Sequence, residues 1–290
     1  MKINAIIIGA GRSGTTTLYQ YLEKHPGICF SSIKEVHYFS VDELYERGEE
    51  YYHSFWKNCN ENALKIAADT YLLISKKAPE RIKKYNPEMK IIIILRNPEE
   101  RAFSSYQYAI NNGYTDKNIS FTKAVNDEEY HIKNSDITTQ NNLCHIYQSK
   151  YFEHISYWSE FFPRNQILIL KTEDLKNNTE FLLKQLSDFL EISEFKITEK
   201  ISANKSAKAK SEALQQFLLN RNTPARKFLR KILPKGIKNL ILNSKFPEKL
   251  SSINRKEIKY EPLSGEDRIF AEHFLEKDKE RMEKIFGIKL

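Results

Sequence analysis

The chain has 290 residues, which suits one large α/β domain, and 40% of them are hydrophobic, enough to form a buried core. It carries 46 Lys and Arg against 38 Asp and Glu, a formal net charge of +8. This composition excludes a disordered chain. No apolar run approaches the roughly 18 residues that a membrane span requires.

The positive charge is concentrated near the C-terminus. Residues 205–259 contain 15 Lys and Arg but only 3 Asp and Glu. The rest of the chain contains 31 basic and 35 acidic residues. A segment this basic predicts an anionic partner: a nucleotide, a polyanionic glycan, nucleic acid or a lipid surface. A solvated lysine-rich face is the alternative that charge alone leaves open.

The three cysteines, Cys29, Cys59 and Cys144, are too few and too scattered to indicate a disulfide framework or a zinc site. We interpret them as thiols in a reducing compartment. The apolar stretch at the N-terminus is too short for the core of a signal peptide. Together these features predict a soluble, cytoplasmic protein, with peripheral contact to a membrane through the basic segment as an option.

Strand-like and helix-like segments alternate along the first half, which predicts a parallel sheet with covering helices. Strands are expected at residues 3–8, 63–69, 90–95 and 166–170. Helices are expected at 16–24, from Asn97-Pro98 onward, and at 142–162, 179–190 and 267–286, with Gly287 as the final cap. Residues 211–246 form a predicted basic amphipathic helical segment.

The fold class expected from this order is a P-loop-like three-layer α/β sandwich with a central parallel sheet. The chain is predicted to be one domain, with an α/β core at residues 1–200 and a basic helical lid or tail at 201–290.

A glycine-rich loop, Gly9-Ala10-Gly11-Arg12-Ser13-Gly14-Thr15-Thr16, joins the first predicted strand to the first predicted helix. Glycines let backbone N–H groups turn inward around an anion, and the helix dipole adds positive potential. The glycine spacing matches a Walker A loop, but Thr15 stands where the lysine of such loops belongs. The loop therefore indicates a group smaller than a triphosphate, with Arg12 as its cation, and counts against a kinase.

Arg-Ser-Gly-Thr-Thr after an apolar strand resembles the 5′-phosphosulfate loop of the sulfotransferases that use 3′-phosphoadenosine 5′-phosphosulfate (PAPS). Many of those enzymes have lysine at the position of Arg12, and the branch that sulfates protein tyrosines has arginine. The resemblance implies that Arg12 stabilises charge on the leaving phosphate. It also implies a donor-binding set in this loop: Gly11, Arg12, Ser13, Gly14, Thr15 and Thr16. No metal is implied, and no cluster of Asp and His in the sequence suggests one.

A second motif follows the strand expected at 90–95. Arg96 would stand at the carboxyl edge of the sheet, where ligands bind, and Ser104 lies eight residues further on. The pair resembles the family's 3′-phosphate motif, which would distinguish PAPS from ATP; an internal salt bridge is the structural alternative for Arg96. Arg101 is expected to pair with acids on its own helix.

A basic stretch at residues 204–211 resembles the family's late loop over the nucleotide. It makes Lys205, Lys208 and Lys210 further candidates for donor contacts, without a preference among the three.

A hydroxyl acceptor loses its proton as it attacks sulfur, so a general base is required. In Lys34-Glu35-Val36-His37-Tyr38-Phe39, side-chain alternation would place Glu35 and His37 on the same side if the segment is extended. The stretch resembles Glu-Val-His-Phe-Phe of the heparan sulfate glucosaminyl sulfotransferases. That implies Glu35 as the base and His37 as a supporting acid–base or orienting residue. A lysine that this branch carries after its third strand is absent here, so a heparan-type substrate is not implied.

The sequence as a whole predicts sulfuryl transfer from PAPS to a hydroxyl of a glycan or glycolipid, with release of 3′-phosphoadenosine 5′-phosphate (PAP). Protein tyrosines, small molecules, amino sugars and lipid headgroups also fit the donor motifs. Nucleic acid is not expected as a partner. Two other classes stay open: a P-loop kinase using ATP, and a non-catalytic protein that binds polyanions or membranes through its basic segment.

Overall fold

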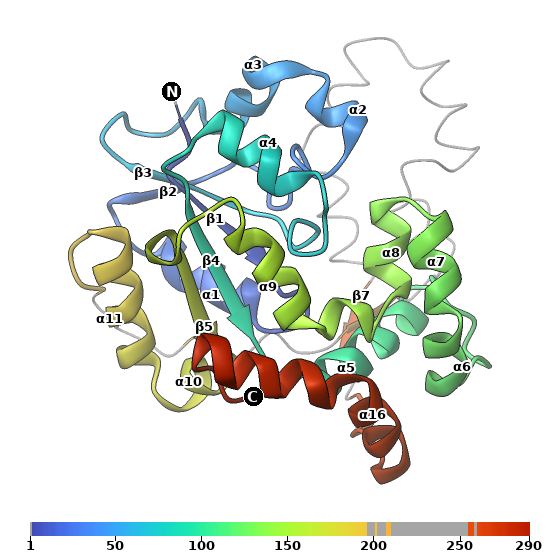
Figure 1. Cartoon of the computed structure of the whole chain (residues 1–290). Coiled ribbons are helices and arrows are strands. Elements are labelled where there is room, and N and C mark those ends of the chain that lie inside the picture. Colours follow the sequence, from blue (N-terminus) through green and yellow to red (C-terminus); the bar gives the residue numbers. More distant parts are fainter. Residues whose placement is uncertain (1, 196–200, 202–206, 210–254, 258–259) are drawn as a thin grey trace, which may run out of the picture.

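A parallel five-stranded sheet in the order β2-β3-β1-β4-β5 forms the centre of the molecule (Figure 1). This computed structural model describes residues 2–195, 201, 207–209, 255–257 and 260–290. The strands are β1 (Ala5–Gly9), β2 (Ile28–Phe30), β3 (Leu64–Ala68), β4 (Lys90–Leu95) and β5 (Ile167–Lys171). The strands expected at 3–8, 63–69, 90–95 and 166–170 are thus confirmed.

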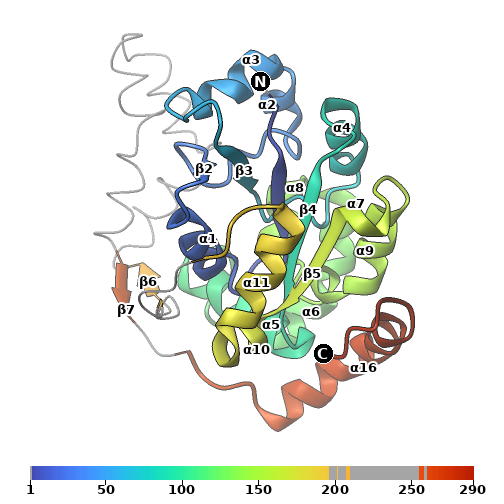
Figure 2. The ribbon, with the colours of Figure 1, turned by 90° about the vertical axis from the view of Figure 1, so that its left-hand side faces the viewer.

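Helices cover both faces of this sheet, as the unbroken apolar strands require. In β4, Ile91 and Ile93 pack in one hydrophobic cluster, and Ile92 and Ile94 pack in the other. One cluster is shared with α1 (Thr15–Glu23), α10 (Thr172–Asn177) and α11 (Thr179–Leu190), which lie in front of the sheet in Figure 2. The opposite cluster is shared with α4 (Ala78–Tyr85) and α9 (Tyr151–Ser159). The three-layer α/β sandwich is confirmed.

The strand order places the ends of three strands side by side. β1 pairs with β3 on one side and with β4 on the other, and all of these pairs are parallel. The loops that follow β1, β3 and β4 therefore leave the same carboxyl edge of the sheet. Ligands of open α/β sheets bind where the chain crosses from one side of the first strand to the other.

Further helices complete the described part of the fold: α2 (Asp42–Tyr45), α3 (Gly48–His53), α5 (Pro98–Asn111), α6 (Phe121–Asn126), α7 (Glu128–Asn134), α8 (Ile137–Leu143) and α16 (Gly265–Arg281). The helix start at Asn97-Pro98 is confirmed, because the Asn97 side chain accepts a hydrogen bond from the Glu100 N–H at 3.0 Å. α16 continues as the π-helical turn η4 (Met282–Phe286), which Gly287 caps with a φ of 69°. Lys279 of α16 pairs with Glu99, a carboxylate only 1% exposed, and so fixes α16 to α5.

The single helix expected at 142–162 is wrong. α8 ends at Leu143, a short 3-10 turn η2 (Tyr147–Ser149) follows, and α9 begins at Tyr151. The buried Glu128 carboxylate accepts the backbone N–H groups of Ile146 and Tyr147, each at 2.8 Å, which a continuous helix would have used internally. Burial raises the pKa of Glu128 to about 7. A long-range contact thus overrides the local helical pattern.

Arg101 does not pair with acids on its own helix, so that expectation is also wrong. Its guanidinium is fully buried and donates hydrogen bonds to the Gln148 side chain at 3.1 Å and to the His145 carbonyl at 2.8 Å. Burial lowers the pKa of Arg101 to about 10. The side chain therefore anchors the same irregular segment against α5.

The basic segment is described only in part. The helical prediction for 211–246 and the candidates Lys205 and Lys210 lie outside the described residues. Lys208 lies on β6 (Ala207–Ala209), which pairs antiparallel with β7 (Arg255–Glu257), and β6 contacts α5. Within the described part of the chain, no helix combines the length and apolar character needed to cross a membrane.

The thiol interpretation is wrong for two of the three cysteines. Cys29 and Cys59 form a disulfide with a Cα–Cα distance of 5.8 Å, whereas Cys144 is free and buried. The Ser32 N–H bonds the Phe55 carbonyl at 2.8 Å, which holds the end of β2 against the segment after α3 and brings the two thiols together. The argument for a reducing compartment therefore loses its basis.

We predict that thiol titration of the denatured, unreduced protein detects one thiol, and that prior reduction raises the count to three. Because the bond closes a loop with a sequence separation of 30, replacing both cysteines with serine is expected to lower the free energy of unfolding by about 3–4 kcal/mol. Cys144→Ser is the control and must leave no thiol before reduction and two thiols after it. Three thiols before reduction would restore the original interpretation.

Candidate functional site

The predicted donor loop connects β1 to α1 at the carboxyl edge of the sheet. Gly9 has a φ of 152°, and a side chain there would place its Cβ 3.0 Å from Leu73 Cβ, while Gly14 caps α1 with a φ of 91°. The Thr172 hydroxyl donates to the Ser13 carbonyl at 2.6 Å and lies 2.9 Å from the Leu95 carbonyl. This buried threonine therefore fixes the loop to the end of β4.

All six predicted donor-binding residues of the loop lie in this short stretch: Gly11, Arg12, Ser13 and Gly14 in the turn, and Thr15 and Thr16 in the first turn of α1. The N-terminus of a helix of this length offers backbone N–H groups and positive potential to an anion.

Arg12 joins the two predicted halves of the donor site. Its Nε lies 3.4 Å from Ser104 Oγ, and its guanidinium carbon lies 4.8 Å from the centre of the Tyr108 ring. The centre of the Tyr260 ring lies 5.8 Å from the same carbon. Because Ser104 and Tyr108 belong to α5, the arginine of the loop is turned toward the helix that carries the second motif.

Arg96 stands at the end of β4 and forms the salt bridge that was its structural alternative. Its Nη2 lies 2.7 Å and its Nε 3.2 Å from Glu100 Oε2, and Arg268 of α16 approaches the other Glu100 oxygen at 3.7 Å. Burial raises the pKa of Glu100, but the hydrogen bond and charge of Arg96 outweigh it and lower that pKa overall. The Arg96 side chain stays 27% exposed, so an anion can share it with Glu100.

The segment with Glu35 and His37 is not extended, so the expected strand-like alternation is wrong. Both residues have left-handed backbone, with φ of 60° and 58°. Among the described residues other than glycine, positive φ occurs only at Arg12, Glu35, His37 and Glu191. Three of these four belong to the predicted site, which fits the tendency of functional sites to hold strained backbone.

A hydrogen-bonded cluster nevertheless brings Glu35 and His37 together. His37 Nδ1 lies 2.9 Å from Asp69 Oδ1, and the His37 ring packs against the Tyr71 ring at 4.0 Å. Asp69 also accepts the Tyr71 N–H at 3.0 Å and the Ser40 hydroxyl at 3.3 Å. The buried carboxylate therefore sets the orientation and tautomer of His37.

Lys34 links Glu35 to the donor loop. Its ammonium lies 3.1 Å from Thr16 Oγ1 and 3.2 Å from Glu35 Oε1, and the Thr70 hydroxyl donates to Glu35 Oε2 at 3.3 Å. Sequence reasoning missed Lys34 and Asp69 as site residues. The available signals were the position of Lys34 directly before Glu35 and that of Asp69 directly after β3.

The sequence suggested no cluster of Asp and His, but the fold forms one. One ligand-type atom from each of Glu35, His37 and Asp69 lies within 4.8 Å of the others. These atoms already share hydrogen bonds and an ion pair, and the Lys34 ammonium 3.2 Å from Glu35 disfavours a second cation. The arrangement fits a proton-handling cluster better than a metal centre.

Tyrosines gather beside this cluster. The Tyr108 and Tyr114 rings lie 6.3 Å apart, and Tyr71 stacks on His37. Burial, followed by the negative charge of Glu35, raises the pKa of Tyr71 well above its usual value. Neutral aromatic side chains therefore lie beside Glu35 and His37.

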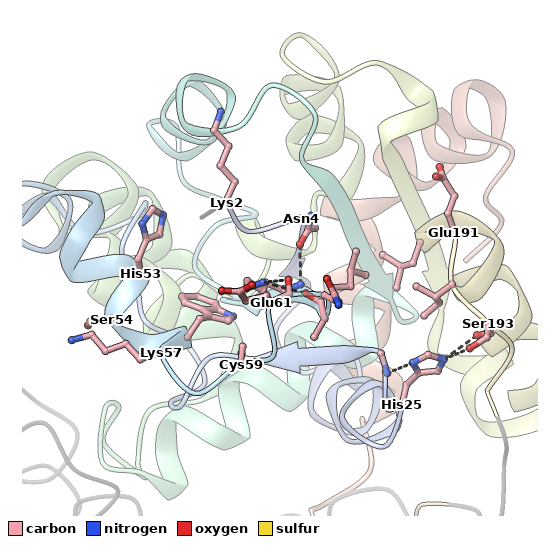
Figure 3. Close-up of a pocket in the computed structure, with 18 of the residues that line it drawn as sticks. Lys2, Asn4, His25, His53, Ser54, Lys57, Cys59, Glu61, Glu191 and Ser193 are labelled. Atoms are coloured by element: carbon pink, nitrogen blue, oxygen red, sulfur yellow. Dashed lines mark hydrogen bonds between the residues drawn. The ribbon is translucent and has the colours of Figure 1, made fainter.

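A groove of about 1340 Å³ opens at the opposite, amino edge of the sheet (Figure 3). Its lining includes Asn4, His25, His53, Glu61 and Ser193, with His25 bonded to Ser193. None of the predicted site residues lines it. Since ligands of such sheets bind at the carboxyl edge, we place the functional site at the glycine loop.

The fold and this loop define an α/β protein with a glycine loop of the anion-binding type at the carboxyl edge of a parallel sheet. A comparison with protein families identifies it further. The model of the sulfotransferase domain matches residues 2–260, so the chain belongs to the sulfotransferase domain family.

Individual relatives agree with this membership. Heparan sulfate glucosamine 3-O-sulfotransferase 5 of Mus musculus is 31% identical over 171 residues, 59% of this chain and 48% of the relative. The membrane-associated sulfotransferase kil1 of Dictyostelium discoideum is 26% identical and shares 65% of this chain and 56% of its own. The chain thus spans about half the length of these curated relatives.

A solved structure supports the fold. The crystal structure of a sulfotransferase from Alicyclobacillus acidocaldarius superposes with a TM-score of 0.69 at 19% identity, covering 100% of this chain and 98% of that one.

We predict that the purified protein contains no stoichiometric metal by mass spectrometry and that its melting temperature does not change with chelator or added Mg²⁺ or Zn²⁺. The reason is that Lys34 and the hydrogen bonds of the cluster already occupy its anionic atoms. Asp69→Asn serves as the comparison. A bound metal in the wild type that Asp69→Asn loses would make Glu35, His37 and Asp69 a metal centre.

Proposed function

We propose that the chain transfers a sulfuryl group from PAPS to a hydroxyl of a carbohydrate by in-line displacement, releasing PAP. The observation that carries the proposal is the joining of the two halves of the site. Arg12 of the donor loop contacts Ser104, and Glu35 is connected to Thr16 of the same loop through Lys34. The proposed base, Glu35, and the proposed donor-binding loop are therefore separated only by the side chain of Lys34.

In the proposed reaction the acceptor oxygen attacks sulfur as its proton passes to the Glu35 carboxylate. The new O–S bond forms while the bond between sulfur and the 5′-phosphate oxygen breaks. Negative charge then grows on the departing phosphate, where Arg12 and the N-terminus of α1 lie. His37, held by Asp69, supports proton transfer or orients the acceptor.

The donor preference is expected to arise from Arg96 and Ser104, which would bind the 3′-phosphate that ATP lacks. Two observations support this expectation: Arg96 is partly exposed beyond the end of β4, and Ser104 contacts Arg12 of the donor loop. Lys208, on a strand that contacts α5, is a further candidate for donor binding. A kinase is the rival, and Thr15 in place of the Walker lysine argues against it.

Two observations favour a carbohydrate acceptor over a tyrosine or a small molecule. Tyr71, Tyr108 and Tyr114 line the acceptor side with aromatic surface, on which a sugar ring can stack while its hydroxyls reach polar groups. One of the relatives is named for sulfation of heparan sulfate glucosamine. The partner proposed is therefore a glycan or a glycolipid headgroup, and nucleic acid is not expected.

For the donor, we predict metal-independent calorimetric binding of PAP, and neither binding of ADP nor a requirement for Mg²⁺. Arg96→Ala is expected to weaken PAP binding about tenfold to a hundredfold, since it removes a charge-assisted phosphate contact. Arg47→Ala, an exposed arginine stacked on Tyr51 away from the loop, is the matched control. Preference for ATP with Mg²⁺, or equal binding of PAP and ADP, would contradict the PAPS donor and favour the kinase assignment.

For the base, we predict that Glu35→Gln lowers the turnover of PAPS into PAP by about 10²–10⁴-fold while PAP binding is kept. The assay offers glycans, glycolipid headgroups, a tyrosine peptide and a phenol as acceptors. Glu46→Gln, at an exposed glutamate after α2, is the control and should retain full turnover. Turnover with the peptide or phenol alone would reject the carbohydrate acceptor, and full activity of Glu35→Gln would reject the base.

A further inference from the structure

The cation of the donor loop is turned toward α5. Arg12 contacts Ser104, which is expected to bind the 3′-phosphate, and the ring of Tyr108 one turn further along the same helix. Glu35, in contrast, must lie close to the sulfuryl group if it accepts the acceptor's proton. A carboxylate placed against a polyanionic donor is repelled unless a cation lies between them.

Among the described residues, Lys34 provides a cation between the donor loop and Glu35. Its ammonium bridges Thr16 Oγ1 of the loop helix at 3.1 Å and Glu35 Oε1 at 3.2 Å. The side chain is 26% exposed, so it is held in place and still accessible to a ligand. An ammonium has three N–H donors, so it can bind a ligand oxygen in addition to its hydrogen bond with Thr16 and its ion pair with Glu35.

The backbone around Lys34 is fixed on both sides. The Ser31 hydroxyl donates to the Ile33 carbonyl at 2.6 Å, and Ile33 packs against the main hydrophobic core. The Glu35 N–H donates to the Ala68 carbonyl at 2.9 Å, at the end of β3. Lys34 therefore starts from a rigid position between the donor loop and the base, as a preorganised catalytic group should.

We propose that Lys34 is a further catalytic residue, whose ammonium binds an oxygen of the sulfuryl group of PAPS during transfer. It keeps its protons throughout: the O–S bond to the acceptor forms, the S–O bond to the 5′-phosphate breaks, and the acceptor proton goes to Glu35. Lys34 neutralises the oxygens of the migrating group and holds it between the loop and the base. The inference rests on the PAPS donor of the proposed function and is independent of the acceptor.

The test compares the affinities of PAPS and PAP, which differ only by the sulfuryl group. Dissociation constants are measured by rapid competition with a fluorescent PAP analogue, without any acceptor present. Lys34→Gln is expected to weaken PAPS binding about tenfold or more, as for one charge-assisted hydrogen bond, and to change PAP binding less than about twofold. Lys34→Arg should recover most of the PAPS affinity.

Lys24→Gln provides the matched control, because Lys24 is exposed at the C-terminal end of the same helix α1. It should change neither constant. Equal weakening of PAPS and PAP by Lys34→Gln, or no change in either, would overturn the role of Lys34 while leaving the donor assignment intact. Failure of the wild type to bind PAP or PAPS would instead overturn the donor assignment, and the role of Lys34 with it.

Discussion

The parallel pairing of β1 with both β3 and β4 determines where the chemistry of this molecule is located. Because the three strands end together, Arg12 after β1, Asp69 after β3 and Arg96 after β4 leave the same edge of the sheet. Each strand contributes one polar group, and the apolar strand interiors keep these exits in register. Helix α5 then returns across the edge and brings Ser104 to Arg12.

Charges at this edge alternate rather than accumulate. Glu100 lies between Arg96 and Arg268, and Glu35 lies beside Lys34. Several cations can therefore stay close together before a ligand arrives, since each carboxylate offsets part of their repulsion. A polyanionic donor would take over that role when it binds, at a place where the cations are already positioned and need little reorganisation.

Local patterns were sufficient to predict the elements that depend on nearest neighbours. The isoleucine runs, the glycine loop and the Asn97-Pro98 helix start all took the expected form. Features that depend on distant residues could not be predicted in this way. The Cys29–Cys59 bond needs the contact between Ser32 and Phe55, and the break near Tyr147 needs the Glu128 carboxylate. Asp69 can contact His37 only because strand β3 ends at Ala68, directly before Asp69.

The left-handed backbone at Glu35 and His37 has an evolutionary consequence. Such a conformation costs of order 1 kcal/mol or more at each residue other than glycine, so the core supports a segment that would relax by itself. Glycine would remove this strain but also the proposed base and its supporting histidine, and β-branched residues would add to the strain. The substitutions tolerated at these two positions are therefore limited by backbone conformation as well as by chemistry. A variant with glycine there would be more stable but would lack the proposed catalytic side chains.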